Sequence, residues 1–426
     1  MIERVRKYID REIGLEPDST IFVAISGGAD STALLLIMKE LGYRFNALHC
    51  NFHLRGDESN RDQVFVEGLC KRQQVPLSIK HFDTEEYANQ HGISIEMAAR
   101  DLRYSWFREE LQHFKIQISK PEFDRVGAFV AVAHHRDDQA ETLLLNLLRG
   151  TGLRGLAGMS PKHDEIIRPL LCLSREEILS YLESKGQSYV TDSTNTEDIC
   201  QRNILRHDFI PLLQRINSAA VEHLCLACDN ARQSFLYYKK GIEAAFKELG
   251  ITETSFTLSA LNSPTLLHEW LYGKGFNKAQ EEEMRQANKS EVGRMWHSST
   301  HTVLRDRNAL ILAQLKESVK PQLEQKVVPC MDEVGPDIAY FDADLLTAPI
   351  AVRRVREGDA FVPFGMKGRK LVSDYLTDRK LNRLEKAETF VATCGDDIIW
   401  LIGHRSDNRY RVTDKTTRIL KLTLKG

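Results

Sequence analysis

The chain has 426 residues and a mass of 48.7 kDa, more than one hydrophobic core of ordinary size supports, so we expect two or three domains. Hydrophobic residues make up 42% and charged residues 28%, values that exclude wholesale disorder and collagen-like repeats. No apolar run approaches the roughly 20 residues of a membrane helix, and the N-terminal segment lacks the apolar stretch of a signal peptide. These properties favour a soluble, cytoplasmic protein.

The placement of the cysteines indicates the redox state of the thiols, and the distribution of charge indicates the kind of partner that the protein binds. The eight cysteines are scattered along the chain, which favours reduced thiols over a disulfide framework. The net charge of −2 is unevenly distributed, because residues 351–426 carry 17 Lys and Arg against 10 Asp and Glu, a net +7, and the remainder carries −9. A basic tail on an acidic body is typical of a polyanion-binding part, although a solvated basic face explains the charge equally well.

Short β-rich runs alternate with helical patterns over the first 150 residues. Buried-strand runs occupy 21–25, 45–52, 77–82 and 128–133, and helical patterns occupy 32–41, 57–73, 94–114 and 137–148. This alternation predicts βαβ units and a parallel sheet with helices on both faces. We therefore expect a doubly wound α/β domain over residues 1–216.

The later part of the chain reads differently. Ser174 followed by Glu177 is a capping box that predicts a helix start, and a long amphipathic helix follows over about 221–238. Residues 294–312 resemble a hairpin, and 315–337, with three prolines among charges, resemble a linker. We expect a mainly helical middle domain over 217–336 and a small, basic α+β C-terminal domain over 337–426.

The segment SGGADS at 26–31 lies between a predicted buried strand and an apolar helix. Adjacent glycines let the backbone approach a ligand closely, and the start of the helix presents free N–H groups and the positive end of its dipole. Asp30 suits such a phosphate site when a divalent cation bridges carboxylate and phosphate. We predict a nucleotide phosphate site here, with a ligand-free turn as the alternative.

A second polar cluster, AHHRDDQAET at 133–142, stands at another strand-to-helix junction. Asp138 and Glu141 are three residues apart, so their carboxylates share a helix face. Such carboxylates hold Mg²⁺ beside phosphates, and His134 suits phosphate contact or proton transfer; capping carboxylates with a surface histidine pair are the alternative. If both junctions follow neighbouring parallel strands, their loops face one crevice, the usual ligand site of open α/β sheets.

Two more motifs carry residues that can take part in binding. The helical stretch EMAARDLRY at 96–104 puts Arg100 and Arg103 about one turn apart, where an arginine contacts phosphate or forms a surface pair with Glu96. Cys225 and Cys228 form a lone C-x-x-C on an apolar stripe, and without a second pair we favour core thiols over a metal site. No Walker-type G-x-x-x-x-G-K-[ST] motif occurs, which argues against γ-phosphate chemistry.

These motifs resemble those of the tRNA(Ile)-lysidine synthetases, a family of the N-type ATP pyrophosphatase (PP-loop) superfamily. The resemblance covers nearly all of residues 20–215 and much of 353–420. The matching stretches are SGGADS (26–31), LHCNFHLRGDESNRD (48–62), EMAARDLRY (96–104), AHHRDDQAETLLLNLLRGTGLRGLAGM (133–159), DSTN (192–195), RNILR (202–206) and RVREGDAFVPFGMKGRKLVSDYL (354–376).

The resemblance implies an ATP- and Mg²⁺-dependent ligase that acts on isoleucine tRNA with a CAU anticodon. Members adenylate the 2-carbonyl oxygen of the wobble cytidine, and the ε-amine of free L-lysine then displaces AMP to give lysidine, which changes codon reading from AUG to AUA. The basic C-terminal domain is expected to grip the tRNA through its phosphates and shape. The resemblance implies no membrane association and does not exclude a homodimer.

By residue, the resemblance assigns one group to the ATP phosphates: Ser26, Gly27, Gly28, Ala29, Asp30 and Ser31. Asp30 and Asp138 are the expected Mg²⁺-linked carboxylates. Glu141, His134 and Arg103 or Arg100 are expected to stabilise charge on the leaving groups or to orient cytidine and lysine. Asn195 and Arg206 are expected to close the site on the substrate.

Two alternatives remain open on the sequence. A PP-loop relative that makes 2-thiocytidine in tRNA shares the loop, but it draws on cysteines near the nucleotide, where this chain has only Cys50 and Cys70. A non-catalytic tRNA-binding protein would not need Asp30, Asp138 and Glu141 together. Lysidine synthesis is the favoured hypothesis.

Overall fold

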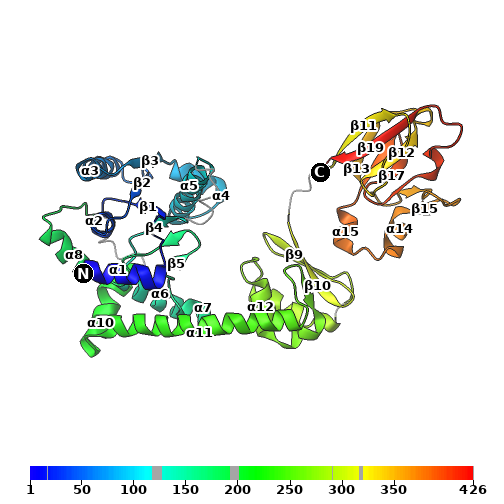
Figure 1. Cartoon of the computed structure of the whole chain (residues 1–426). Helices are drawn as coiled ribbons and strands as arrows, with labels where there is room; N and C mark the ends of the chain where they lie inside the picture. Colours follow the sequence, from blue (N-terminus) through cyan, green and yellow to red (C-terminus); the bar gives the residue numbers. More distant parts are fainter. Residues whose placement is uncertain (17, 118–126, 192–200, 290, 316–319, 426) are drawn as a thin grey trace. The chain divides into compact units, whose positions relative to one another are not determined.

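The computed structural model describes residues 1–16, 18–117, 127–191, 201–289, 291–315 and 320–425 (Figure 1). The chain forms two compact units, Met1–Tyr238 and Lys239–Gly426, divided within the long helix α11 (Ala220–Glu248). Among the described residues, no helix combines the length and the apolar character needed to cross a membrane.

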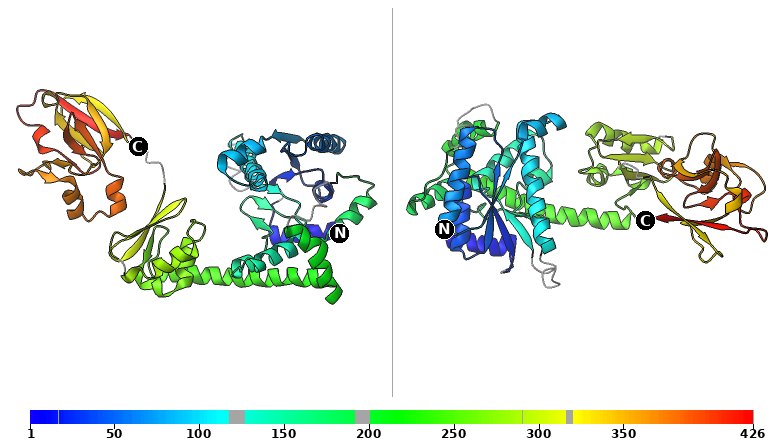
Figure 2. Two further views of the ribbon diagram at one scale, coloured as in Figure 1. Left: turned by 180° about the vertical axis from the view of Figure 1, so that it is seen from behind. Right: turned by 90° about the horizontal axis from the view of Figure 1, so that it is seen from above.

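A six-stranded sheet lies at the centre of the first unit, in the order β3-β2-β1-β4-β6-β5 (Figures 1 and 2). All neighbours are parallel except the β5–β6 pair, which confirms the predicted doubly wound α/β domain. The strands are β1 (Thr20–Ala24), β2 (Phe45–Asn51), β3 (Leu77–His81), β4 (Ala128–Ala131), β5 (Lys162–His163) and β6 (Ile166–Ile167).

Helices cover both faces of this sheet. The α-helices described up to residue 216 are α1 (Ile2–Tyr8), α2 (Ala29–Glu40), α3 (Asp57–Gln73), α4 (Thr84–His91), α5 (Ile95–Gln117), α6 (Arg136–Leu148), α7 (Leu153–Leu156), α8 (Arg175–Ser184), α9 (Gln201–Ile204) and α10 (Ile210–Ile216). Apolar residues of α1, α2, α3 and α8 pack on one face, and those of α5 pack on the other.

The sequence of β1 explains why it lies in the middle. Ile21 and Val23 point into the core formed with α2, whereas Phe22 points into the core formed with α5. A strand buried on both faces reads as a continuous apolar run. Because β2 and β4 flank β1 on opposite sides, the sheet order reverses between β1 and β4, and the loops after these two strands open into one crevice.

The second unit begins with a helical part that also holds a small sheet. The helices α12 (Pro264–Leu271) and α13 (Lys278–Arg285) follow α11, and the antiparallel sheet has the order β7-β10-β9-β8. Its strands are β7 (Ser255–Thr257), β8 (Met295–His297), β9 (His301–Arg305) and β10 (Ala309–Gln314). The predicted hairpin is thus the β9–β10 pair, and Trp270 and Phe256 pack in the core between helices and sheet.

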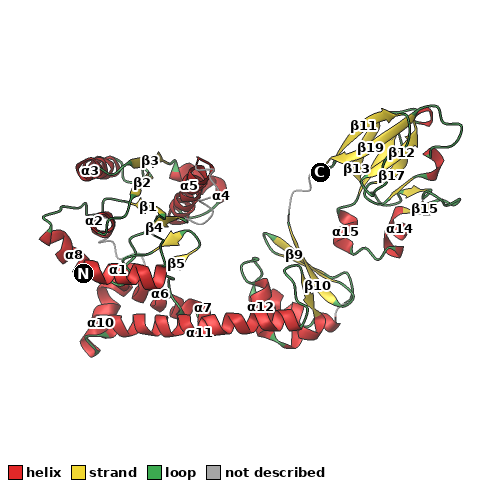
Figure 3. Cartoon of the chain, in the orientation of Figure 1, coloured by secondary structure: helices red, strands yellow, loops and turns green. Residues whose placement is uncertain are grey.

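Residues 322–425 form antiparallel sheets with two short helices, α14 (Val372–Asp378) and α15 (Arg383–Ala387) (Figure 3). The strands are β11 (Gln322–Val328), β12 (Ile338–Asp342), β13 (Ile350–Arg354), β14 (Ala360–Phe361), β15 (Lys370–Leu371), β16 (Phe390–Cys394), β17 (Asp397–Leu401), β18 (Arg405–Ser406) and β19 (Ile419–Lys425). The small α+β C-terminal domain is confirmed. The prediction of a linker over 315–337 was wrong in part, because β11 pairs with β19 along its whole length.

Candidate active site

The loop after β1 has the geometry of an anion-binding turn. Gly28 is the N-cap of α2 in an extended conformation, and Gly27 has a φ of +93°, which a residue with a side chain rarely adopts. The hydroxyl of Ser31 donates to the carbonyl of Gly28 at 3.1 Å, and that of Thr32 donates to the carbonyl of Gly27 at 3.2 Å. These bonds hold the turn so that the first N–H groups of α2 face the crevice.

The loop after β4 and the start of α6 bring a histidine and two carboxylates to the crevice, where they meet Asp30 of α2. His135 is the N-cap of α6 and is 1% exposed. Its Nε2 lies 3.7 Å from Asp30 Oδ1 and 3.5 Å from Asp138 Oδ2, and its Nδ1 lies 3.5 Å from Asp137 Oδ2. Burial alone would lower the pKa of His135, but the surrounding carboxylates outweigh burial and raise it. The imidazole therefore compensates negative charge at the point where the two loops meet.

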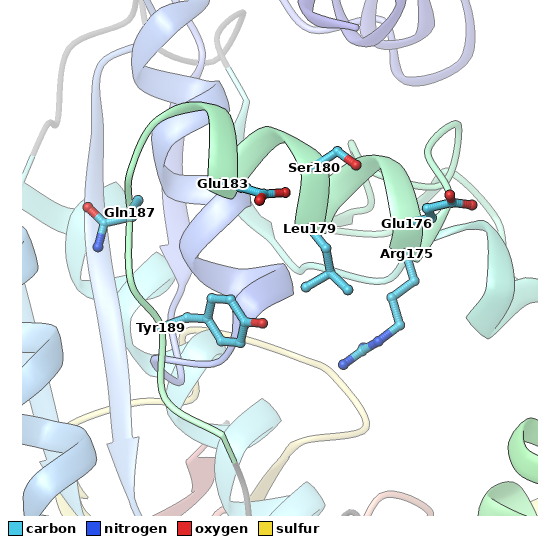
Figure 4. A pocket seen from close by; sticks show the side chains of 7 residues that line it. All are labelled: Arg175, Glu176, Leu179, Ser180, Glu183, Gln187 and Tyr189. Carbon is cyan, nitrogen blue, oxygen red and sulfur yellow. The ribbon is translucent and has the colours of Figure 1, made fainter.

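Arg175, the first residue of α8, ties both loops to this helix. Its Nη1 donates to Asp30 Oδ2 at 3.0 Å, and its backbone N–H donates to Asp137 Oδ2 at 2.9 Å. Figure 4 shows Arg175 and Leu179 pointing from α8 toward the ring of Tyr189, around a hollow of about 520 Å³. The next residue, Val190, donates its N–H to the carbonyl of Gly27 at 2.9 Å, so this hollow borders the loop 26–31.

One turn further along α6, Glu141 is buried beside two arginines. Its side chain is 1% exposed, and Oε1 accepts a bond of 2.8 Å from Arg206 Nε. Arg206 also reaches Asp138 Oδ1 at 3.4 Å, and Arg202 Nε lies 4.0 Å from Glu141 Oε2. Burial raises the pKa of Glu141 despite the pairing with Arg206. Asp138 and Glu141 therefore share one helix face, and Arg206 joins them.

Among the described residues, His134 forms no hydrogen bond with Asp138 or Glu141, and it contacts a different arginine, Arg168. Arg168 Nε lies 3.3 Å from His134 Nδ1, and burial lowers the pKa of His134 to about 4. His134 is therefore neutral near pH 7. Arg100 and Arg103 are exposed, with their guanidinium groups over the rings of Tyr104 and Phe52 at 5.2 and 5.3 Å. In the part of the chain that the structure describes, neither arginine forms an ion pair with Glu96, which was the alternative, and each lies over an aromatic ring.

The crevice contains carboxylate oxygens of the kind that bind a divalent cation. Asp30 Oδ1 is buried and has no hydrogen-bond partner among the described residues, and Asp138 lies beside the same His135 nitrogen. Buried carboxylate oxygens without partners are costly unless a cation or a ligand donor reaches them. Since Mg²⁺ prefers oxygen ligands from one or two carboxylates together with phosphates, the residues present fit such an ion.

The structure brings together most of the predicted residues: Asp30, Asp138, Glu141 and Arg206 adjoin one another around the crevice, with the loop 26–31 beside them. Asn195 lies outside the described residues. The sequence did not single out Arg175 or His135. A capping serine at 174 did place Arg175 at a helix start, but nothing in the pattern paired it with Asp30.

A parallel sheet with a glycine-rich phosphate loop at its switch point, and a carboxylate within that loop, defines a nucleotide-binding α/β protein. A family model described as "PP-loop domain" matches residues 1–213, and one described as "TilS substrate binding domain" matches residues 255–315. The first of these gives the class: the first unit is a PP-loop domain.

Relatives match the whole chain. The tRNA(Ile)-lysidine synthase of Parabacteroides distasonis is 40% identical over 100% of both chains, and that of Bacteroides thetaiotaomicron is 42% identical over 98% of both. Among solved structures, the U34-tRNA thiolase NcsA of Methanococcus maripaludis aligns with 54% of this chain and 77% of its own, at 19% identity and a TM-score of 0.42. On the full-length relatives, the chain belongs to the tRNA(Ile)-lysidine synthase family.

Proposed function

We propose that this protein ligates free lysine to the C2 carbon of the wobble cytidine in isoleucine tRNA with a CAU anticodon, at the expense of ATP. The observation that carries the proposal is the meeting of Asp30, Asp138 and Glu141 in one crevice beside the phosphate loop. It does so in a chain that is 40% identical throughout to a tRNA(Ile)-lysidine synthase. The products are lysidine, AMP and pyrophosphate.

In the first step, the 2-carbonyl oxygen of cytidine attacks the α-phosphorus of ATP, and the bond between the α- and β-phosphates breaks. The phosphate oxygens lie against the N–H groups at the start of α2 and the hydroxyl of Ser26. Arg175 is within reach of the same phosphates once it leaves Asp30. Charge that develops on the departing pyrophosphate is stabilised by these donors.

Asp30 and Asp138 would hold Mg²⁺, which would supply positive charge against the phosphate oxygens. Without a cation, Arg175 and His135 compensate the two carboxylates. This arrangement supports the assignment of Asp30 and Asp138 as the carboxylates that face the phosphates.

In the second step, the lysine ε-amine attacks C2, the bond from C2 to the adenylated oxygen breaks, AMP leaves, and the nitrogen loses a proton. Glu141 is suited to receive the lysine side chain, because its Oε2 is buried and has no hydrogen-bond partner among the described residues. Neutral His134 can donate a hydrogen bond from Nε2, because its Nδ1 accepts the bond from Arg168. Arg100 and Arg103 would meet phosphate or cytidine groups from α5.

The tRNA-binding part is proposed to lie in the second unit. The family model described as a substrate-binding domain spans 255–315, and the C-terminal residues carry the excess of positive charge that phosphate contacts require. Catalytic, middle and C-terminal domains over 1–216, 217–336 and 337–426 remain our proposed division.

The competing proposal, sulfur transfer to cytidine, is disfavoured by the cysteines near the crevice. Burial raises the pKa of Cys50 to about 12 and that of Cys70 to about 11. A nucleophilic or sulfur-carrying cysteine needs an accessible thiolate. Both thiols are protonated near pH 7 and pack as small apolar side chains.

The proposal is tested by incorporation of radiolabelled lysine into an isoleucine CAU tRNA transcript, with and without ATP. We expect ATP-dependent label in this tRNA and none in a methionine tRNA. The variant Asp30→Ala should abolish labelling. If the wild-type protein cleaves ATP to AMP and pyrophosphate but transfers no lysine, the proposed nucleophile is wrong; ammonia and sulfur donors would be tried next.

A further inference from the structure

The first half of the loop between β14 and β15 (residues 362–369) is hydrogen-bonded to residues 406–408, at the end of β18 and just after it. Val362 donates its N–H to Asp407 Oδ2 at 2.9 Å, Phe364 donates to the Ser406 carbonyl at 2.9 Å, and Gly365 donates to Asn408 Oδ1 at 3.1 Å. Asp407 is 0% exposed. The backbone of this half of the loop is therefore fixed before any ligand arrives.

This loop displays apolar side chains that the core does not use. Phe364 is 45% exposed and Met366 is 46% exposed. The neighbouring Phe361 and Val372 are fully buried in a hydrophobic cluster, and Phe364 and Met366 are not part of that cluster. Large apolar side chains exposed on one short loop and rimmed by polar residues indicate a contact surface.

Most of the charged side chains around this loop are positive. Lys367 and Arg369 follow on the same loop and are exposed, and the guanidinium of Arg405 lies 5.9 Å from the centre of the Phe364 ring. A hollow of about 530 Å³ adjoins the loop, and its charged lining residues are Lys367, Arg409 and Arg411 together with Asp342. Among the described residues, Lys367 has no hydrogen bond or ion pair, so its charge is available to a ligand.

We propose that the loop 362–369 is a base-stacking site for RNA. Phe364 and Met366 contact the face of an unpaired or terminal base, while Lys367 and Arg369 contact the phosphates next to it. Aromatic rings interleaved with cations are the usual platform for single-stranded nucleic acid, because every base offers a π-face and every nucleotide a negative charge. The inference rests on the proposed function, since it takes the tRNA substrate as the RNA.

The experiment measures binding of the full-length chain to the isoleucine CAU tRNA transcript as a function of salt. We expect Phe364→Ala to weaken binding by roughly 5- to 100-fold, the range for loss of one base stack, with an unchanged salt slope. Phe364→Trp should retain the affinity. The double variant K367A/R369A should make the salt dependence shallower by about one to two units of slope.

Met331→Ala is the matched control, because Met331 is 58% exposed in the same unit and lies outside the loop; it should bind as the wild type does. A transcript without its single-stranded 3′ end locates the base. If the wild type and Phe364→Ala bind this shortened transcript equally, the base that stacks on Phe364 lies at the 3′ end. If Phe364→Ala still binds more weakly, that base lies in a loop of the tRNA. Either outcome supports the site.

Equal affinity of Phe364→Ala and wild type for the complete transcript overturns the inference, as does an equal loss in Phe364→Trp. Capture of a protein partner or of anionic vesicles by the loop, with RNA binding unaffected, also overturns it. Lysine transfer to an isolated anticodon stem–loop at saturating concentration separates this failure from that of the proposed function. With this stem–loop, Phe364→Ala should transfer lysine at the same rate as the wild type. Absence of transfer by the wild type would contradict the proposed function itself.

Discussion

The guanidinium of Arg175 lies 3.0 Å from the carboxylate of Asp30, although 145 residues separate them in the chain. The pair links α8 to the phosphate loop and leaves Arg175 partly exposed, with 38% of its side chain accessible. An arginine in this position can exchange a carboxylate for a phosphate group without a large movement of its helix.

We expect Arg175→Ala to weaken ATP binding by about tenfold or more, since a charge-assisted hydrogen bond contributes about 1.5–3 kcal/mol. Titration calorimetry with ATP and Mg²⁺ measures the effect. Arg175→Lys should recover part of the affinity, because it keeps the charge but not the paired N–H groups. Unchanged ATP affinity in Arg175→Ala would show that the Asp30 contact has no part in nucleotide binding.

A substitution at Glu141 tests whether this residue acts in lysine transfer and not in adenylation. We expect Glu141→Gln to slow lysine transfer by at least roughly 100-fold while adenylation of the tRNA continues, because the amide cannot attract an ammonium group or accept its proton. Single-turnover assays with labelled ATP should then show adenylated tRNA accumulating. Glu222→Gln, which changes an exposed carboxylate paired with Arg136 at 3.1 Å, should behave as wild type. Equal losses in both steps would assign Glu141 to the structure of the site instead.

Two adjacent glycines make a controlled comparison of backbone strain. Gly27 has a φ of +93°, and an added Cβ would lie 3.4 Å from Phe65 and Val66. We expect Gly27→Ala to destabilise Met1–Tyr238 by about 1–2 kcal/mol, the cost of that backbone region for an L-residue. Gly28 has a φ of −67° and its nearest atom would be Ser26 Oγ at 3.5 Å, so Gly28→Ala should cost less than about 1 kcal/mol. Similar unfolding free energies for the two variants would contradict this account.

Asp359 predicts a pH dependence in the second unit. Its carboxylate accepts bonds of 2.7 and 2.9 Å from the two terminal nitrogens of Arg353. Burial would raise the pKa of Asp359, but these bonds and the Arg356 N–H outweigh burial and lower it. Because the folded pKa is the lower one, the stabilisation is present above the unfolded value near 3.8 and is lost as the pH falls through the folded pKa.

We therefore expect Asp359→Asn to destabilise this unit near neutral pH by about 1–3 kcal/mol, and the difference from wild type to shrink below pH 3.8. Hydrogen exchange of the β16 and β17 amides in the full chain measures it. A difference that stays constant from neutral pH into the acid range would mean that the ion pair does not stabilise the fold.

The strands and helices of the first unit could be predicted closely from the sequence, because each central strand is buried on both faces. The run 21–25, for example, corresponds to β1 at Thr20–Ala24. The strands that were missed carry little pattern: β5 and β6 have two residues each. In β11, five of seven side chains are exposed, so no alternation between apolar and polar residues marks it as a strand.

The candidate site was predictable where residues stand in one motif and not where distant elements meet. Asp138 and Glu141 share a helix face, which spacing alone implies. The contact between Asp30 and Arg175 depends on how α8 packs beside α2, and no local pattern encodes it. His135 was passed over for His134 because both fit the same junction, and only the backbone direction at the N-cap of α6 turns His135 toward the carboxylates.

The adjacency of β1 and β4 couples the site to folding. The register pairs Ile21 with Phe129, so the phosphate loop and the carboxylates of α6 reach one crevice only after a segment about a hundred residues later has docked beside β1. A nucleotide that touches both loops binds the docked state alone, and at a hundred times its Kd it adds about 2.7 kcal/mol to the stability of that state. Thermodynamic linkage should therefore raise the unfolding temperature of Met1–Tyr238 on addition of ATP and leave that of Lys239–Gly426 unchanged.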